Sequence, residues 1–81
     1  MTREDLLKRL EEIIKVQDPA KALLISEKTS LKDDLGVDSI ELMEFVINVE
    51  DAFSISIPDE DVETLMTIGD LIDYLQKKLA K

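Results

Sequence analysis

The chain contains no cysteine and no histidine. Without cysteine it has no thiolate nucleophile, no disulfide and no cysteine-based metal site. Without histidine it lacks the usual general base at neutral pH and the commonest ligand of transition metals. These absences argue against a self-contained hydrolase or a zinc enzyme. We therefore expect no catalytic residue and no metal site in this chain.

Aromatic residues are also scarce, since Phe45, Phe53 and Tyr74 are the three in a chain of 81 residues. Aliphatic side chains must therefore build the core, and a hydrophobic content of 44% is sufficient for one. A second core would require roughly 50 residues of its own. We expect residues 1–81 to form a single domain.

Long apolar runs are missing as well. The sequence has no run of 18 apolar residues and no apolar segment near residue 1 that resembles a signal peptide. From these absences we expect a chain that does not insert stably into membranes, and a cytoplasmic location.

Basic residues are absent from more than half of the chain. Residues 33–76 carry thirteen acidic and no basic side chains, whereas residues 1–32 carry six acidic and seven basic ones. The formal net charge is −9. Such a surface repels phosphates, so we expect no nucleic-acid binding. It attracts basic protein partners instead, at rates that fall with added salt.

Hydrophobic spacing predicts an all-α fold with three longer helices, one short helix and a long first loop. The first helix is expected to begin at Arg3, because Thr2 and Asp5 form a capping-box pattern, and to run to about Val16. The segment 17–38 lacks a helical period and is expected to be irregular. We expect five apolar residues to hold it on the core: Leu23, Leu24, Ile25, Leu31 and Leu35.

A second helix is predicted from about Ser39 to Phe53, with apolar residues in two sets. The first set is assigned to the core and consists of Leu42, Phe45, Val46, Val49, Ala52 and Phe53. The second set is the strip Ile40, Met43 and Ile47, beside which lie Glu44, Glu50 and Asp51. Either this helix is buried on a broad front, or the strip is a surface on which a partner docks.

The sequence after residue 53 predicts a short connecting segment, a short helix and then a last helix. Residues 54–58 alternate like a strand but have no second strand to pair with, and Asp59–Leu65 is typical of a short helix. Thr67 and Asp70 form a second capping-box pattern. The helix after it presents one apolar face, made of Ile68, Leu71, Ile72, Leu75 and Leu79.

The run Asp34-Leu35-Gly36-Val37-Asp38-Ser39 precedes the second helix. Asp38 is a suitable N-cap, and Glu41 three residues later completes a capping-box spacing. Ser39 would then be the first helical residue, at the positive end of the helix, where a phosphate ester is favoured. Alternatively, Ser39 is itself a cap. It is not a hydrolytic nucleophile, because no histidine is present to activate it.

Taken together, these residues resemble the acyl carrier proteins of type II fatty-acid synthesis. The resemblance lies in the runs D-D-L-G-V-D-S-I-E-L-M-E, E-D-A-F and I-S-I-P-D-E-D, followed by T-I-G-D-L. It covers about residues 31–79. The sequence departs from the family at Ile40, where leucine is commoner, and at Asn48, where a small or apolar residue is usual.

The resemblance implies a four-helix bundle in which Ser39 carries 4′-phosphopantetheine, installed from coenzyme A by a holo-acyl-carrier-protein synthase. The thiol of that arm would hold fatty-acyl chains as thioesters and present them to basic-faced fatty-acid synthesis enzymes and acyltransferases. We expect the carrier to be a monomer. The family's docking residues correspond to Asp38, Ile40, Glu41, Met43, Glu44, Ile47, Glu50 and Asp51.

The resemblance also implies an interior that accepts the acyl chain. The matching positions are Val46, Val49, Phe53, Ile57, Val62, Leu65 and Ile68. Two alternatives stay open at this point. One is a dedicated carrier of another cargo, such as an aminoacyl or polyketide intermediate, and the other is an unmodified helical module that binds a partner helix.

Overall fold

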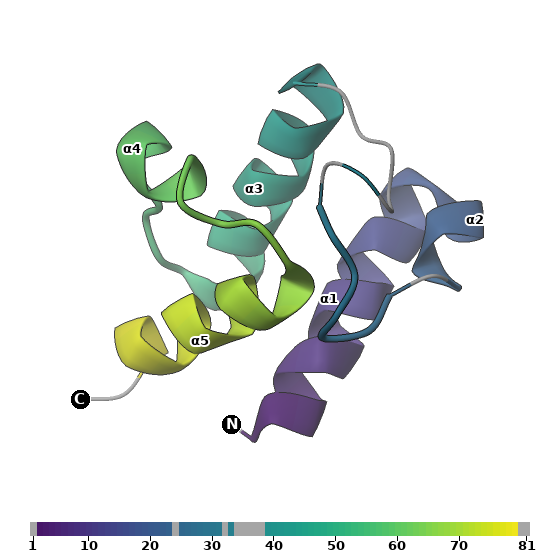
Figure 1. Ribbon diagram of the computed structural model, residues 1–81, viewed down its shortest axis with the longest axis horizontal. Coiled ribbons are helices and arrows are strands. Elements are labelled where there is room, and N and C mark those ends of the chain that lie inside the picture. Colours follow the sequence, from purple (N-terminus) through teal and green to yellow (C-terminus); the bar gives the residue numbers. More distant parts are fainter. Residues whose placement is uncertain (1, 24, 32, 34–38, 80–81) are drawn as a thin grey trace.

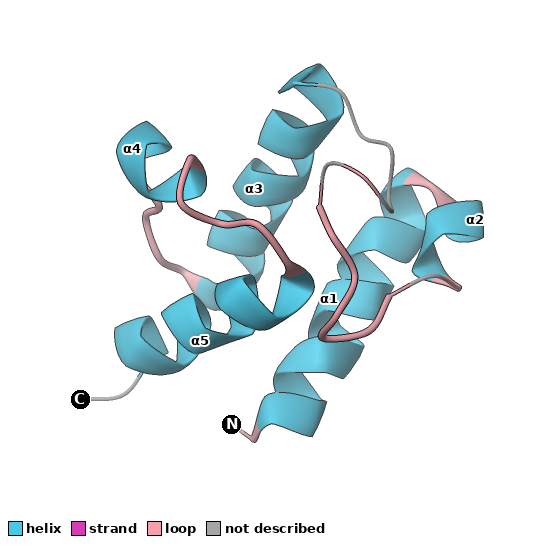
Figure 2. Cartoon of the chain, viewed as in Figure 1, coloured by secondary structure: helices cyan, strands magenta, loops and turns pink. Residues whose placement is uncertain are grey.

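The computed structural model describes residues 2–23, 25–31, 33 and 39–79, with Ser39 described in its backbone alone. Within these ranges the chain is helical and contains no extended strand (Figures 1 and 2). The helices are α1 (Arg3–Gln17), α2 (Pro19–Ala22), α3 (Ser39–Phe53), α4 (Asp59–Val62) and α5 (Ile68–Leu79). The predicted all-α fold is confirmed, with α2 as an additional short helix.

The start of α1 follows from its cap. The hydroxyl of Thr2 accepts the N–H of Asp5 at 3.1 Å, and the Asp5 carboxylate accepts the N–H of Thr2 at 3.3 Å. This reciprocal pair satisfies two backbone donors that the helix cannot satisfy itself. The inner face of α1 then buries Leu6, Leu10 and Ile14. Both the predicted start and the predicted core face are confirmed.

The segment after α1 differs from the expectation of a long irregular loop. α1 continues to Gln17, and the Asp18 carboxylate then accepts the N–H of Ala20 at 3.2 Å, with Pro19 at the first position of α2. An aspartate cap followed by proline favours a helical turn. The expectation for Leu23 is wrong, because this side chain is 89% exposed.

Described residues later in the segment 17–38 do pack against the core. Ile25 and Leu31 are buried as expected, while Leu24 and Leu35 lie outside the described residues. The backbone of residues 27–31 is tied to the start of α5, since Gly69 N–H donates to Glu27 O at 2.8 Å and Ile68 N–H to Thr29 O at 2.9 Å. A Cβ at position 69 would meet Glu27 O at 2.8 Å, which explains the glycine by close approach.

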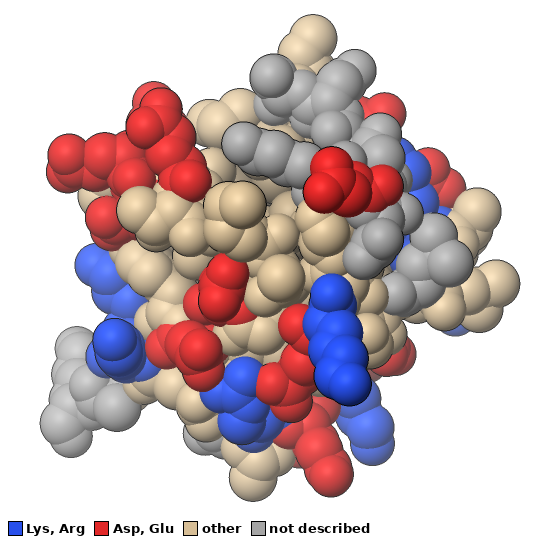
Figure 3. All heavy atoms as spheres, viewed as in Figure 1, with Lys and Arg blue, Asp and Glu red and all other residues tan. Residues whose placement is uncertain are grey.

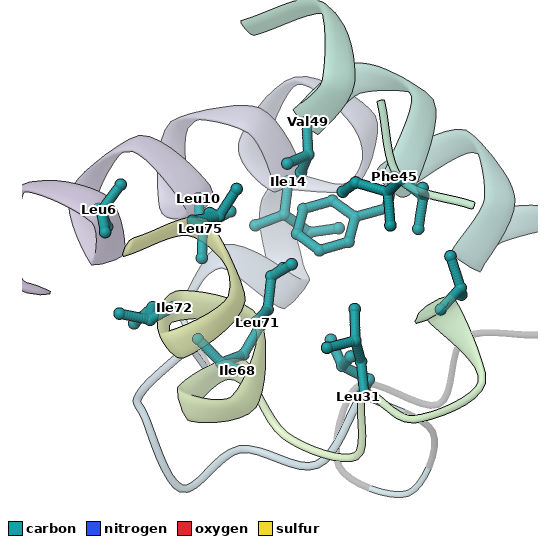
Figure 4. Packing of buried hydrophobic residues seen from close by; sticks show 14 of the residues in the cluster. Leu6, Leu10, Ile14, Leu31, Phe45, Val49, Ile68, Leu71, Ile72 and Leu75 are labelled. Carbon is teal, nitrogen blue, oxygen red and sulfur yellow. The ribbon is translucent and has the colours of Figure 1, made fainter. Parts of the chain in front are cut away.

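Three helices supply most of the core. Figure 4 shows Phe45 and Val49 of α3 lying toward Ile14 of α1 and Leu71 of α5. α3 has the predicted bounds, and of its predicted core set Phe45, Val46 and Val49 are buried while Leu42, Ala52 and Phe53 are half-buried. The core is aliphatic apart from Phe45, as the composition requires.

The connection from α3 to α5 turns sharply. Ser54 has a φ of 55°, a left-handed conformation that ends α3, and residues 55–58 then run without regular structure to α4. α4 is shorter than the predicted Asp59–Leu65 because two turn residues follow Val62. The predicted cap of α5 is confirmed: Thr67 Oγ1 accepts Asp70 N–H at 3.1 Å and Asp70 Oδ2 accepts Thr67 N–H at 3.2 Å.

Candidate functional site

The candidate site begins where α3 begins. Ser39 is the first residue of this helix, as the sequence predicted. The N–H groups in the first turn of a helix have no carbonyl partner within it, and the helix dipole makes this end positive. The position therefore suits a covalently attached phosphate ester. The capping role predicted for Asp38 lies outside the described residues.

The outer face of α3 exposes the predicted apolar strip. Ile40 is 72% exposed, Ile47 50% and Met43 38%, whereas Phe45, Val46 and Val49 on the other side of the helix are at most 4% exposed. The two sets that the helical wheel separates are thus separate in the structure. This decides against a helix that is buried on a broad front.

The acids around this strip fall into two kinds. Glu44 and Asp51 are exposed, and no described residue bonds to either carboxylate. Glu41 accepts a hydrogen bond from Lys21 Nζ at 2.5 Å, and Glu50 accepts the backbone N–H of Ile57 at 2.8 Å. Two of the acids predicted for docking are therefore already engaged within the chain.

Two polar residues next to the site, Gln17 and Asn48, were not among the site residues predicted from the sequence. Gln17 Nε2 donates to the backbone carbonyl of Glu41 at 3.0 Å, and Asn48 Nδ2 lies 3.5 Å from Gln17 Oε1. Together, Gln17 and Lys21 join the end of α1 and the short helix α2 to the first turn of α3. Asn48, at which the sequence departs from the family, thus contacts this junction through Gln17.

The predicted acyl-pocket residues come together in the structure. Val46, Val49, Ile57, Val62, Leu65 and Ile68 are buried in one apolar cluster, to which α3, α4, α5 and the connections between them contribute. Phe53 is half-buried at the rim, where the Arg9 guanidinium lies 5.6 Å from the centre of its ring. The cluster is a wall of aliphatic side chains without polar atoms.

Two hydrogen bonds fasten the outer wall of this cluster. Glu50 anchors the backbone beside Ile57, and Tyr74 of α5 donates its hydroxyl proton to Asp61 Oδ2 of α4 at 2.7 Å. Burial, and then this bond to the carboxylate, raise the pKa of Tyr74 to about 12. α4 is held at this point and by the burial of Val62.

Acidic side chains gather over α4 at the upper left of Figure 3, whereas most of the blue side chains on this face lie lower. Even so, the part of the chain that the structure describes has no group of three acidic side chains placed to hold a metal ion. Among the same residues, no helix is long and apolar enough to cross a membrane.

Comparison with known proteins gives a consistent result. A family model described as a phosphopantetheine attachment site matches residues 4–75. An acyl carrier protein from an Exiguobacterium species is 43% identical over 79 residues, which cover 98% of this chain and 100% of that protein. The acyl carrier proteins of Thermotoga maritima and Myxococcus xanthus are 33% and 36% identical, over 96% and 91% of this chain and 96% and 94% of their own lengths.

Proposed function

Because the chain belongs to the acyl carrier proteins of the phosphopantetheine-attachment family, we propose that Ser39 is the residue that carries 4′-phosphopantetheine. Members of this family are non-catalytic carriers of acyl chains. The observation that carries the assignment is the position of Ser39 as the first residue of α3, directly before the exposed apolar strip. A serine hydroxyl is the group that a phosphodiester needs.

The residues around Ser39 fit such a group. The N–H groups in the first turn of α3 have no carbonyl partner within the helix, and together with the helix dipole they favour the negative charge of a phosphodiester. When bound, the arm supplies a terminal thiol on which acyl groups are held as thioesters, which explains how a chain without cysteine takes part in thioester chemistry. α3 and its neighbours then serve as the rigid base from which the acyl group is presented.

The interior cluster supports a second role, as the place where the acyl chain retreats. Its lining is aliphatic, and its outer wall is α4, a helix of four residues that buries one of them. Moving a short helix breaks fewer contacts than moving a long one. We therefore assign Val46, Val49, Phe53, Ile57, Val62, Leu65 and Ile68 to the acyl pocket.

The outer face of α3 supports docking of basic-faced enzymes. Its exposed strip offers apolar contact, and Glu44 and Asp51 offer free negative charge on the same helix. The expected partners are a holo-acyl-carrier-protein synthase, the enzymes of fatty-acid synthesis and acyltransferases. We propose that the carrier acts in the cytoplasm, as a monomer that meets each enzyme briefly.

The attachment site is tested by intact mass after incubation with coenzyme A, Mg²⁺ and a holo-acyl-carrier-protein synthase. The unaltered chain and a Ser56→Ala control, which changes an exposed serine between α3 and α4, should each gain the mass of one phosphopantetheine arm. Ser39→Ala should gain none. A gain in Ser39→Ala would move the site elsewhere, and no gain in the unaltered chain would favour an unmodified interaction module.

A further inference from the structure

The negative charge along the outer face of α3 is uneven. In the first turn, the Glu41 carboxylate lies 2.5 Å from Lys21 Nζ. Farther along, Glu44 and Asp51 are exposed and have no partner among the described residues. Among the described acids of this face, Glu41 is thus paired with a lysine of the chain, whereas Glu44 and Asp51 are not.

Lys21 is largely buried where it contacts Glu41. Its side chain is 17% exposed although lysine is usually a well-exposed residue, and its ammonium also lies 3.8 Å from Asp18. Gln17, the last residue of α1, contacts the same residue of α3 by donating to the Glu41 carbonyl at 3.0 Å. Because most of the Lys21 side chain is already buried, the ion pair orders less free side chain than a pair between two exposed residues would.

Glu41 nevertheless stays within reach of a partner, since 42% of its side chain is exposed. A basic side chain of a partner enzyme would have to displace Lys21 from Glu41. The free energy of binding would then gain only the difference between two similar ion pairs. A cation that approaches Glu44 or Asp51 displaces nothing. These two acids are seven residues apart, which is about 10 Å along a helix.

We propose that Lys21 competes internally with basic side chains of partner enzymes for Glu41, so that partners are selected through Glu44 and Asp51. The preferred partner surface carries two basic groups about 10 Å apart that flank an apolar contact for the strip. Lys21 is thus a residue that determines specificity without touching the acyl group or its attachment site. This inference rests on the docking role proposed above for α3.

The test measures kcat and KM for loading by a bacterial holo-acyl-carrier-protein synthase at low ionic strength. Lys21→Gln should lower KM about three- to ten-fold and leave kcat unchanged, because it removes the internal cation that competes with the enzyme for Glu41. Lys77→Gln is the matched control: it removes one positive charge from the last turn of α5, which Figure 1 places far from the start of α3. It should lower KM by less than about two-fold.

A double substitution isolates the effect of the ion pair between Lys21 and Glu41. In a Glu41→Gln background, Lys21→Gln should no longer lower KM, because no carboxylate remains to be released. The inference is overturned if Lys21→Gln behaves like Lys77→Gln, or if the decrease persists in that background.

A second comparison keeps Lys21 in place and so covers the case in which Lys21→Gln unfolds the chain. Glu41→Gln should raise KM by less than about two-fold, whereas Glu44→Gln should raise it about three-fold or more. Equal effects of the two would overturn the inference. If Glu44→Gln and Glu41→Gln both leave KM unchanged while Ser39 is still loaded, the docking role of α3 fails and the attachment site stands.

Discussion

α3 and α5 are helices of similar length, 15 and 12 residues, but their side chains are arranged by different principles. α5 has an acid in its first turn and Lys77 and Lys78 in its last, so both ends complement the helix dipole. α3 has no basic residue in its last turn and carries Glu50 and Asp51 there instead. Its charges therefore oppose the dipole at that end.

The apolar residues of the two helices differ in the same way. α5 buries Ile68, Leu71, Ile72 and Leu75 on one face, whereas α3 leaves three large apolar side chains exposed on the face opposite its core set. A helix selected for stability alone would not keep exposed isoleucines beside repelling acids. The comparison shows that α5 places its large apolar residues in the core, while α3 exposes three of them on the face that we propose for docking.

The largest effect is expected when a buried side chain of α5 is truncated to alanine, compared with an exposed side chain of α3. Leu75→Ala in α5 should lower the free energy of unfolding by about 2–4 kcal/mol, because Leu75 is fully buried. Ile47→Ala in α3 should change it by less than about 0.5 kcal/mol, because half of that side chain is exposed. Urea unfolding measures both. A loss from Ile47→Ala comparable to that from Leu75→Ala would contradict the assignment of the strip to the surface.

The second effect concerns association. Glu44→Lys should slow association with a holo-acyl-carrier-protein synthase or a ketosynthase about ten-fold at low salt, since it places a repelling charge on the docking face. The helical circular dichroism signal should not change. Glu12→Lys, the same change on the exposed part of α1, is the matched control and should slow association far less. Unaltered kinetics for Glu44→Lys would argue against docking through α3.

The third effect is a pH dependence of the free energy of unfolding, which originates at Tyr74 of α5. The pKa of Tyr74 is raised from 10.0 to about 12, so the folded chain holds a proton that the unfolded chain releases between these values. The stabilisation is therefore complete below pH 10 and is lost as the pH rises toward 12. We expect Tyr74→Phe to abolish this decrease, which we put at about 1 kcal/mol because Tyr74 is only half-buried, since phenylalanine has no hydroxyl to titrate.

The measurement is the free energy of unfolding of the unaltered chain and Tyr74→Phe between pH 8 and 12. All other ionisable groups are the same in the two proteins, so a change in the difference between the curves isolates Tyr74. Parallel curves over the whole range would show that folding does not raise the pKa of Tyr74.

The smallest effects test the two helix ends directly. Asp51→Asn should raise the free energy of unfolding by about 0.3–1 kcal/mol, because it removes a negative charge from the C-terminal end of α3. Lys77→Gln should lower it by a similar amount at the corresponding end of α5. Both differences should shrink in 1 M salt, where such charges are screened. Changes of the same sign in the two variants would refute the contrast between the helices.

Much of the fold is predictable because it depends on residues close together in the sequence. The capping boxes of α1 and α5 join residues three positions apart, and both form as predicted. The bounds of α3 and the division between its buried and exposed apolar sets also follow from the helical period alone. The Leu-Gly-Val-Asp-Ser run contains Ser39, the proposed attachment site, and these five residues are adjacent in the sequence.

Other features required the tertiary structure, because they join residues far apart in the chain. Lys21 and Gln17 meet Glu41 across 20 and 24 positions, and no local pattern predicts such a contact. Gly69 is explained by a carbonyl that the fold brings to it from position 27. Sequence by itself thus determined the helices, the exposed strip and the family of the chain. Which acids of α3 are paired within the chain was decided by packing, since charge pairing depends on distance in space.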